Sequence, residues 1–113
     1  MPQPVLPGTL ELLALNAIAL GPAHGFALME RIQRGSRDVL QVEQGALYPA
    51  LHRLEAQGLV VGSWGISENN RRAKFYALTP AGERQLTVER ARWQELVDGM
   101  QALLSGPAPV VQP

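Results

Sequence analysis

The sequence predicts a winged helix-turn-helix, a mainly helical domain with a two-stranded β wing, followed by one long C-terminal helix. Three observations predict it. Three helical segments come first, each ended by a glycine. Two segments rich in branched and aromatic residues then flank a polar stretch, and one apolar pattern of helical period runs through the C-terminal third. The expected element order is therefore ααα-ββ-α.

The first two helices are predicted from their apolar spacing and their ends. The first begins after Thr9, its expected N-cap, and ends at Gly21. Its apolar residues cover most of its circumference, so we expect it to be buried on more than one side. The second helix is predicted over residues 24–34. We interpret His24 as a loop or helix-start residue and not as a metal ligand, because no second histidine or cysteine accompanies it.

The third helix, predicted over residues 43–57 with Gly58 as its left-handed C-cap, has two different faces. A buried stripe is expected to consist of Leu47, Ala50, Leu51 and Leu54. The opposite face carries hydrogen-bonding and small side chains, which can reach base edges or phosphates and allow close approach to DNA. The candidate DNA-binding residues of this recognition face are Gln44, Gly45, Tyr48, Pro49, His52 and Arg53. The alternative is a solvated helix face without a ligand.

A β-hairpin with a long polar tip is predicted from strands at residues 59–64 and 74–78. The tip combines cations and amides beside a turn, a pattern that favours contact with a phosphate backbone or a minor groove. Its candidate DNA-binding residues are Asn69, Asn70, Arg71, Arg72 and Lys74. Glu68 reduces the local charge, and the alternative is a solubilising turn. Trp64 is interpreted as a strand residue that anchors the wing.

The last helix is predicted to begin with Thr79 as N-cap and Pro80 at its first position, and to continue to about residue 105. An apolar stripe recurs along it at nearly heptad spacing, as in a coiled-coil seam. Its members are Leu86, Trp93, Leu96, Val97, Met100, Leu103 and Leu104. We expect this stripe to form a homodimer interface, with packing inside the chain as the alternative. Trp93 is also the candidate contact for a planar effector, if the interface leaves a cavity.

Composition favours a single soluble domain. The chain has 113 residues, 46% of them apolar, and no cysteine, which excludes a disulfide framework. No apolar run is long enough to span a membrane and no secretory signal is visible, so we expect a cytoplasmic protein. The expected division is a flexible N-terminus over residues 1–7, a winged-helix domain over 8–78, a dimerisation helix over 79–105 and a disordered Pro-rich tail over 106–113.

The net charge is zero, but the cations are unevenly placed. Residues 24–76 hold seven cations and five anions, and nine of the ten cations in the chain are arginine, which suits forked bonds to phosphate. The two histidines are far apart, and no phosphate-binding glycine loop or carboxylate cluster is present. We therefore expect neither an enzyme nor a bound cofactor or metal.

Three segments resemble those of PadR-type transcriptional regulators: LGPAHGFAL at residues 20–28, QGALYPALHRLE at 44–55 and GISENNRRAKFY at 65–76. The likeness covers roughly residues 7–104, and the sequence TPAG at 79–82 is similar to a short subgroup of that family with a single C-terminal helix. The resemblance implies a winged-helix dimer joined chiefly through its C-terminal helix, often with help from the partner's first helix.

The resemblance also implies binding to a palindromic operator, commonly as a repressor. Some members of the family respond to phenolic acids or flat hydrophobic compounds at the dimer interface, and one relative places an aromatic residue in the helix that carries Trp93 here. We therefore expect a homodimer that binds double-stranded DNA, with a small hydrophobic or aromatic effector as a candidate ligand. The alternative is a winged-helix module that binds another protein and no DNA.

Overall fold

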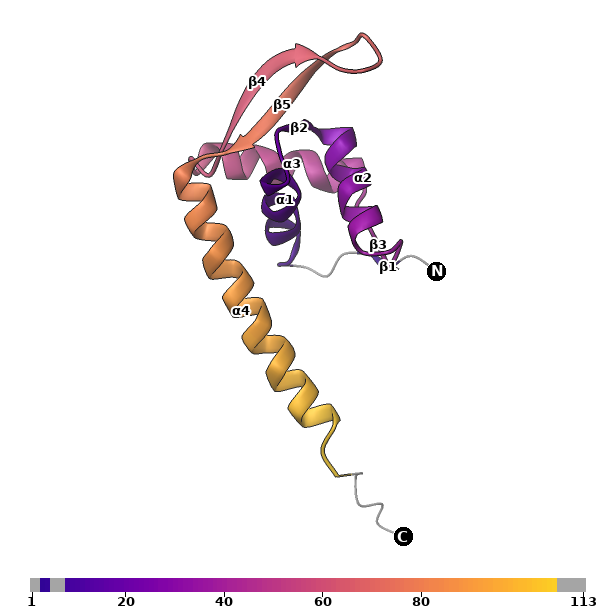
Figure 1. Ribbon diagram of the computed structural model, residues 1–113, viewed down its shortest axis with the longest axis vertical. Helices are drawn as coiled ribbons and strands as arrows, with labels where there is room; N and C mark the ends of the chain where they lie inside the picture. The colour runs from indigo at the N-terminus through magenta and orange to yellow at the C-terminus, as the bar shows by residue number, and fades with distance from the viewer. Residues whose placement is uncertain (1–2, 5–7, 108–113) are drawn as a thin grey trace.

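The computed structural model describes residues 3–4 and 8–107. Three short helices lie beneath a β-hairpin, and one long helix leaves this group of elements and ends far from the hairpin (Figure 1). The helices are α1 (Leu10–Ala19), α2 (Gly25–Gly35), α3 (Gln44–Ala56) and α4 (Pro80–Leu104). The strands are β1 (Gln3–Pro4), β2 (Ala23–His24), β3 (Leu40–Gln41), β4 (Val60–Ile66) and β5 (Arg72–Leu78). The predicted winged helix-turn-helix is confirmed.

Helix α1 lies at the centre of the domain. It contacts α2, α3, α4 and β5, which confirms the expected burial on more than one side. The predicted stripe of α3 is also confirmed, because its four apolar residues are almost completely buried. Thr9 is the N-cap of α1, as predicted, but its backbone angles are helical and its side chain makes no capping hydrogen bond. We refer to residues 8–79 as the winged-helix head.

The hairpin is longer than the sequence predicted. Its antiparallel pairing runs from Val60 opposite Leu78 to Ile66 opposite Arg72, and β2 adds a third strand beside β5. Backbone pairing does not require apolar side chains, so it continues into the polar segment until the Ser67 amide donates to the Arg71 carbonyl at 2.8 Å. Arg72 and Lys74 are therefore strand residues, and the tip is confined to residues 67–71.

The start of α4 is fixed to the base of the wing. As predicted, Pro80 is the first helical residue and Thr79 is the N-cap: its Oγ1 accepts a hydrogen bond from the Gly82 amide at 3.0 Å and donates one to the Gly58 carbonyl at 2.6 Å. A Cβ atom on Gly82 would lie 2.0 Å from the Leu59 carbonyl oxygen. Only glycine therefore lets the helix approach this closely.

The first turns of α4 pack against the core of the head. Leu86 is only 5% exposed and packs within its own chain, so its assignment to the dimer interface was wrong: the helix still faces the head at this turn. None of residues 87–107, all of which the structure describes, is buried. The C-terminal end of α4 extends away from the three short helices (Figure 1).

No helix among the described residues is both long and apolar enough to cross a membrane. The flexible N-terminus predicted for residues 1–7 lies outside the described residues except for positions 3–4, where β1 pairs with β3. The predicted Pro-rich tail lies outside them from residue 108 onward. The predicted domain division stays a prediction.

Candidate nucleic-acid interface

The recognition face of α3 is open to solvent. All six candidate residues on it are exposed, on the side of the helix opposite the buried stripe. Pro49 lies inside the helix and has no amide hydrogen, so it cannot donate to the Gly45 carbonyl one turn earlier. The face therefore presents hydrogen-bonding side chains to solvent, which is the chemistry that a groove of DNA can use.

Tyr48 lies between α3 and the start of α2. A Cβ atom on Gly25 would meet the Tyr48 ring and hydroxyl at 2.8 Å, so this glycine makes room for the ring. The Tyr48 residue is still 36% exposed. Its hydroxyl is thus held beside the first turn of α2 and remains accessible from the recognition face.

Two of the four candidate cations are already paired within the chain. Arg53 donates from Nε at 3.0 Å and from Nη2 at 2.7 Å to one carboxylate oxygen of Glu11 in α1. Lys74 donates from Nζ to Glu55 Oε1 at 2.8 Å, which joins the wing to α3. Both pairs neutralise charge that the sequence assigned to DNA, and Lys74 lies in β5, as its place in the predicted strand 74–78 implied.

The Glu55–Lys74 pair also shifts the acidity of both groups. The hydrogen bond from Lys74 lowers the pKa of the Glu55 carboxyl, and the same bond raises the pKa of the Lys74 ammonium. Both groups therefore remain charged around neutral pH. The Lys74 Nζ atom also lies 5.5 Å from the centre of the Tyr76 ring, so its contacts point toward the base of the wing.

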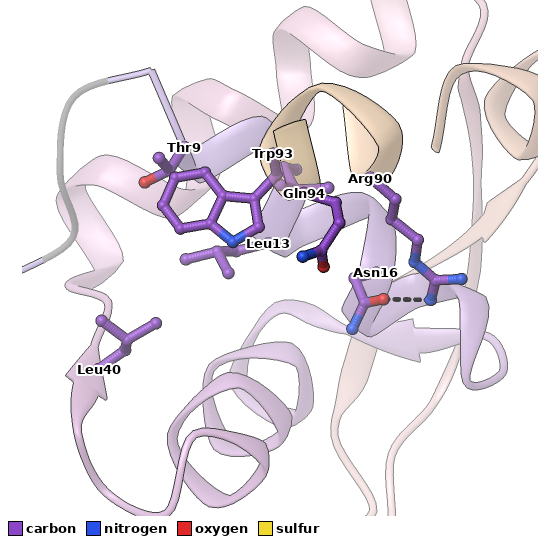
Figure 2. A pocket seen from close by; sticks show the side chains of 8 residues that line it. Thr9, Leu13, Asn16, Leu40, Arg90, Trp93 and Gln94 are labelled. Carbon is purple, nitrogen blue, oxygen red and sulfur yellow. Dashed lines mark hydrogen bonds between the residues drawn. The ribbon is translucent and has the colours of Figure 1, made fainter. Parts of the chain in front are cut away.

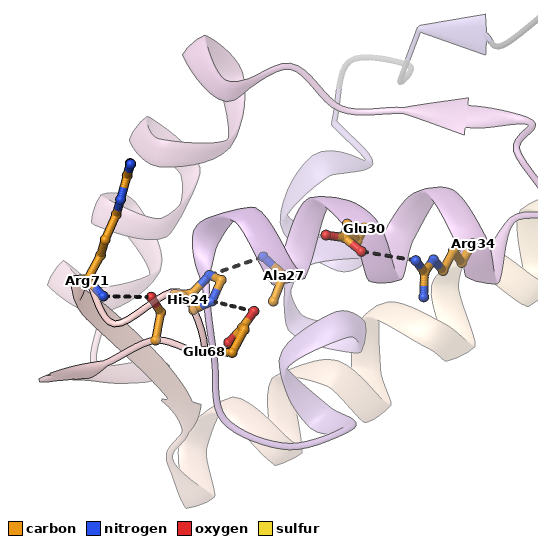
Figure 3. A network of polar contacts seen from close by, with 7 residues as sticks. His24, Ala27, Glu30, Arg34, Glu68 and Arg71 are labelled. Atoms are coloured by element: carbon orange, nitrogen blue, oxygen red, sulfur yellow. Dashed lines mark hydrogen bonds and ion pairs between the residues drawn. The ribbon is translucent and has the colours of Figure 1, made fainter.

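The other two candidate cations have no carboxylate partner in the part of the chain that the structure describes. Within residues 3–4 and 8–107, neither Arg71 nor Arg72 forms an ion pair. Arg71 lies in the turn, where its backbone amide donates to Ser67 Oγ at 3.3 Å and its side chain extends away from the loop (Figure 3). The Arg72 guanidinium lies over the Trp64 ring, 4.8 Å from its centre. Asn69 and Asn70 are exposed in the same turn.

His24 holds the wing tip against the helices. Its Nδ1 accepts a hydrogen bond from the Ala27 amide at 3.2 Å, which confirms the interpretation of His24 as a helix-start residue. Its Nε2 lies 3.5 Å from Glu68 Oε1, and its ring meets the Phe75 ring edge-on at 5.4 Å (Figure 3). The pKa of Glu68 is lowered chiefly by a hydrogen bond from its own backbone amide, with the His24 contact adding to the effect. No group of residues in the described chain is suited to hold a metal ion.

The apolar stripe of α4 lies on the surface. Trp93, Leu96, Met100, Leu103 and Leu104 are between 40% and 78% exposed, and Val97 is half-buried. Exposing such a continuous apolar strip to water is unfavourable, so another element is expected to cover it. The structure describes one chain, so the expected dimer interface remains a prediction.

A pocket of about 520 Å³ opens between α1 and the middle of α4. It is lined by Thr9, Leu12, Leu13, Asn16, Leu40, Arg90, Trp93 and Gln94. The Trp93 indole lies beside Thr9 and Leu13, and Arg90 donates to Asn16 Oδ1 at the other end (Figure 2). Sequence reasoning identified only Trp93; the apolar residues around the whole circumference of the first helix were a signal for Leu12 and Leu13.

These elements define a class of protein. Three helices, the third with one exposed face, and a β-hairpin that carries Arg71 and Arg72 form a winged helix-turn-helix of the DNA-binding kind. The family model described as the transcriptional regulator PadR-like family matches residues 14–88. The chain belongs to the PadR-like family of transcriptional regulators, and membership implies regulation through DNA and no enzymatic activity.

Individual relatives agree with this assignment. The transcriptional regulator Rv3488 of Mycobacterium tuberculosis is 39% identical over 82 residues, which are 73% of this chain and 73% of the relative. The structure of a PadR family transcriptional regulator from Eggerthella lenta is 34% identical and superposes with a TM-score of 0.74, covering 88% of this chain and 85% of that one. The structure of smu.1704 from Streptococcus mutans is 23% identical with a TM-score of 0.78 and covers 98% and 100% of the two chains, which extends the likeness of fold to α4.

Proposed function

We propose that the protein is a homodimeric repressor that binds a palindromic DNA operator through α3 and the wing of each subunit. One observation carries the proposal: the exposed face of α3 lies beside a wing whose two arginines, Arg71 and Arg72, have no carboxylate partner among the described residues. Unpaired arginines are the groups that exchange counterions for DNA phosphates. Exposed polar side chains on α3 are the groups that read bases.

The exposed stripe of α4 supports the dimer. It is continuous with the pocket beside α1, because Trp93 belongs to both. Two copies that pair through these surfaces would cover apolar side chains that one chain leaves in water. Two-fold pairing sets equivalent helices about 34 Å apart, one turn of B-DNA, when both are to reach one face of an operator.

The direct test is selection of bound fragments from genomic DNA, followed by titration with the recovered duplex. Inverted half-sites whose centres are about 10 base pairs apart, or a multiple of that, are expected. Repression is tested by fusing the recovered site to a reporter gene, whose expression should rise when the regulator is removed.

The wing is tested by changing both Arg71 and Arg72 to alanine. We expect the slope of log affinity against log salt to fall by about one to two units. The matched control changes two other exposed cations to alanine: Arg34 in the last turn of α2 and Arg37 in the turn that follows it. The control removes the same charge, so an equal loss in both variants would argue against contact by the wing.

The dimer is tested by changing Leu96 and Met100 to glutamate. Because both side chains are exposed in the single chain, we expect the head to stay folded while analytical ultracentrifugation shows a monomer. Affinity for the palindrome should fall more than about tenfold, since the two half-sites no longer act together. A variant that remains a dimer would place the interface elsewhere.

We also propose that the pocket beside Trp93 binds a small planar aromatic effector that releases DNA. The proposal is supported by the apolar floor of Leu12 and Leu13, by the indole wall, and by the polar groups at one end. Fluorescence in a Trp64→Phe background reports on Trp93 alone, since the chain has two tryptophans. Saturable quenching by an aromatic compound that also releases the operator is expected; a panel that quenches nothing would argue against an effector.

The alternative function is a winged-helix module that binds protein. It would be favoured if the protein stays dimeric yet retains no genomic duplex at low salt. The neutral overall charge is the observation that keeps this alternative open.

A further inference from the structure

Trp64 is the largest exposed side chain of the wing. It is 62% exposed, and its ring carries the Arg72 guanidinium 4.8 Å from its centre. A single exposed apolar residue is ordinary on a protein surface. An indole that holds one of the two unpaired cations of the wing is a more specific arrangement.

The strand register places this pair on the side of the wing that is turned toward α3. Trp64 lies opposite Lys74, and Arg72 lies two residues before Lys74 on the same strand, so alternation puts all three side chains on one face. Lys74 bonds to Glu55 of α3, which fixes the direction of that face. Trp64 thus lies beside Lys74, and Arg72 lies about 7 Å further along the strand toward the tip.

The two arginines of the wing, Arg71 and Arg72, are therefore held differently. Arg71 lies in the turn, where the recorded hydrogen bonds involve only its backbone amide and carbonyl, both with Ser67. Arg72 lies in a paired strand with its guanidinium against an aromatic ring. A guanidinium that stacks on a ring keeps its N–H groups directed outward, and it loses less rotamer freedom when it binds a phosphate.

We propose that Trp64 is a positioning residue for DNA binding, which holds the Arg72 guanidinium in place to bind a backbone phosphate, whereas Arg71 contributes a mobile charge. This assignment rests on the proposed DNA-binding function. Trp64 itself carries no charge and acts through Arg72. Removing the indole should therefore weaken binding without changing the number of phosphates neutralised.

The test is a double-mutant cycle on duplex affinity, using Trp64→Ala, Arg72→Ala and the double variant with the selected operator at several salt concentrations. We expect Trp64→Ala to weaken binding about two- to fivefold, with an unchanged salt slope. Arg72→Ala should lower the slope by about one. In the Arg72→Ala background, Trp64→Ala should have no further effect.

Two controls separate positioning from folding. Val61→Ala removes an exposed side chain from the opposite face of the same strand and should leave affinity unchanged. Trp64→Phe keeps a ring beneath Arg72 and should recover part of the lost affinity. In the free protein, the NMR signal of the Arg72 Nε–H group should lose its ring-current shift in Trp64→Ala and keep it in Val61→Ala.

The outcomes are distinct. If the wild-type protein binds no duplex, the proposed function fails, and this assignment fails with it. If the wild-type protein binds and Trp64→Ala binds equally well, only the assignment is overturned. It is also overturned if Trp64→Ala weakens binding just as much when Arg72 is already alanine, because the indole would then act independently of the guanidinium.

Discussion

In the winged-helix head, six large side chains are less than 2% exposed, whereas none of the described residues 93–104 in the distal half of α4 is buried. Both regions are helical and both carry apolar stripes. The stripes of the head meet one another around α1, but the stripe of distal α4 meets water. The same local pattern thus has two different fates within one chain.

The difference shows which region can be stabilised by packing within a single subunit. An amphipathic helix gains most of its stability from the face that it buries. The head closes its own core, so its stability should follow from packing within one subunit. Distal α4 forms no core of its own, so its helical structure should depend on the surface that covers its apolar stripe. The Leu96→Glu, Met100→Glu variant, if monomeric, allows both regions to be measured without a partner.

The largest effect is expected in the core of the head. Leu51 is fully buried, so Leu51→Ala should lower the free energy of unfolding by about 2–5 kcal/mol. In the monomeric background, Leu103→Ala removes the same group from an exposed site and should change it by less than about 0.5 kcal/mol. Urea unfolding followed by circular dichroism measures both, and similar losses would remove the distinction between the regions.

The joint between the two regions comes next. Gly82→Ala would place a methyl group against the Leu59 carbonyl, so we expect it to destabilise the head by about 1–3 kcal/mol. This is the opposite of the usual effect of alanine in a helix. Thermal unfolding would detect it, and a variant as stable as the wild type would mean that α4 can shift away from the wing.

A smaller loss is expected at the N-cap of α4. Thr79→Ala removes both the bond from the Gly82 amide and the bond to the Gly58 carbonyl, and should cost about 1 kcal/mol. Thr79→Ser keeps the hydroxyl and should retain most of the stability. Equal losses in the two variants would point to the threonine methyl group instead of the hydrogen bonds.

The smallest effect is expected in distal α4. Nothing lies within 4 Å of a Cβ atom on Gly99, so Gly99→Ala should stabilise the helix locally by about 0.5–1 kcal/mol in the monomeric background. Hydrogen exchange of the α4 amides should slow while urea unfolding of the head is unchanged. If the gain disappears when Leu96 and Met100 are restored, atoms of a second copy in the proposed dimer lie beside Gly99.

Much of the fold was predictable from local signals. Glycines and proline marked the ends of the helices, and the start of α4 at Pro80 was predicted to the residue. The buried stripe of α3 followed from helical spacing alone. These features are determined by residues that are close together in the sequence, so the sequence alone is enough to predict them.

The candidate site was predicted less completely, because its contacts join distant segments. Arg53 meets Glu11 across 42 positions and Lys74 meets Glu55 across 19, so nothing local showed that these charges were paired. Leu86 followed the same period as Trp93, but which turn of a helix leaves the core is decided by packing. The contact of Arg72 with Trp64 required the strand register, which extends beyond the apolar residues used to predict the strands.

Helix α4 is continuous from the joint at Gly82 to Leu104. Each residue turns an α-helix by about 100° and advances it by about 1.5 Å. In the proposed dimer, one residue inserted between the joint and Trp93 would rotate each head by about 100° about the axis of α4. The α3 helix of that head would then no longer face its major groove. Seven inserted residues would restore the angle to within about 20° and move each head by about 10 Å. The length of this helix would therefore encode the half-site spacing of the operator.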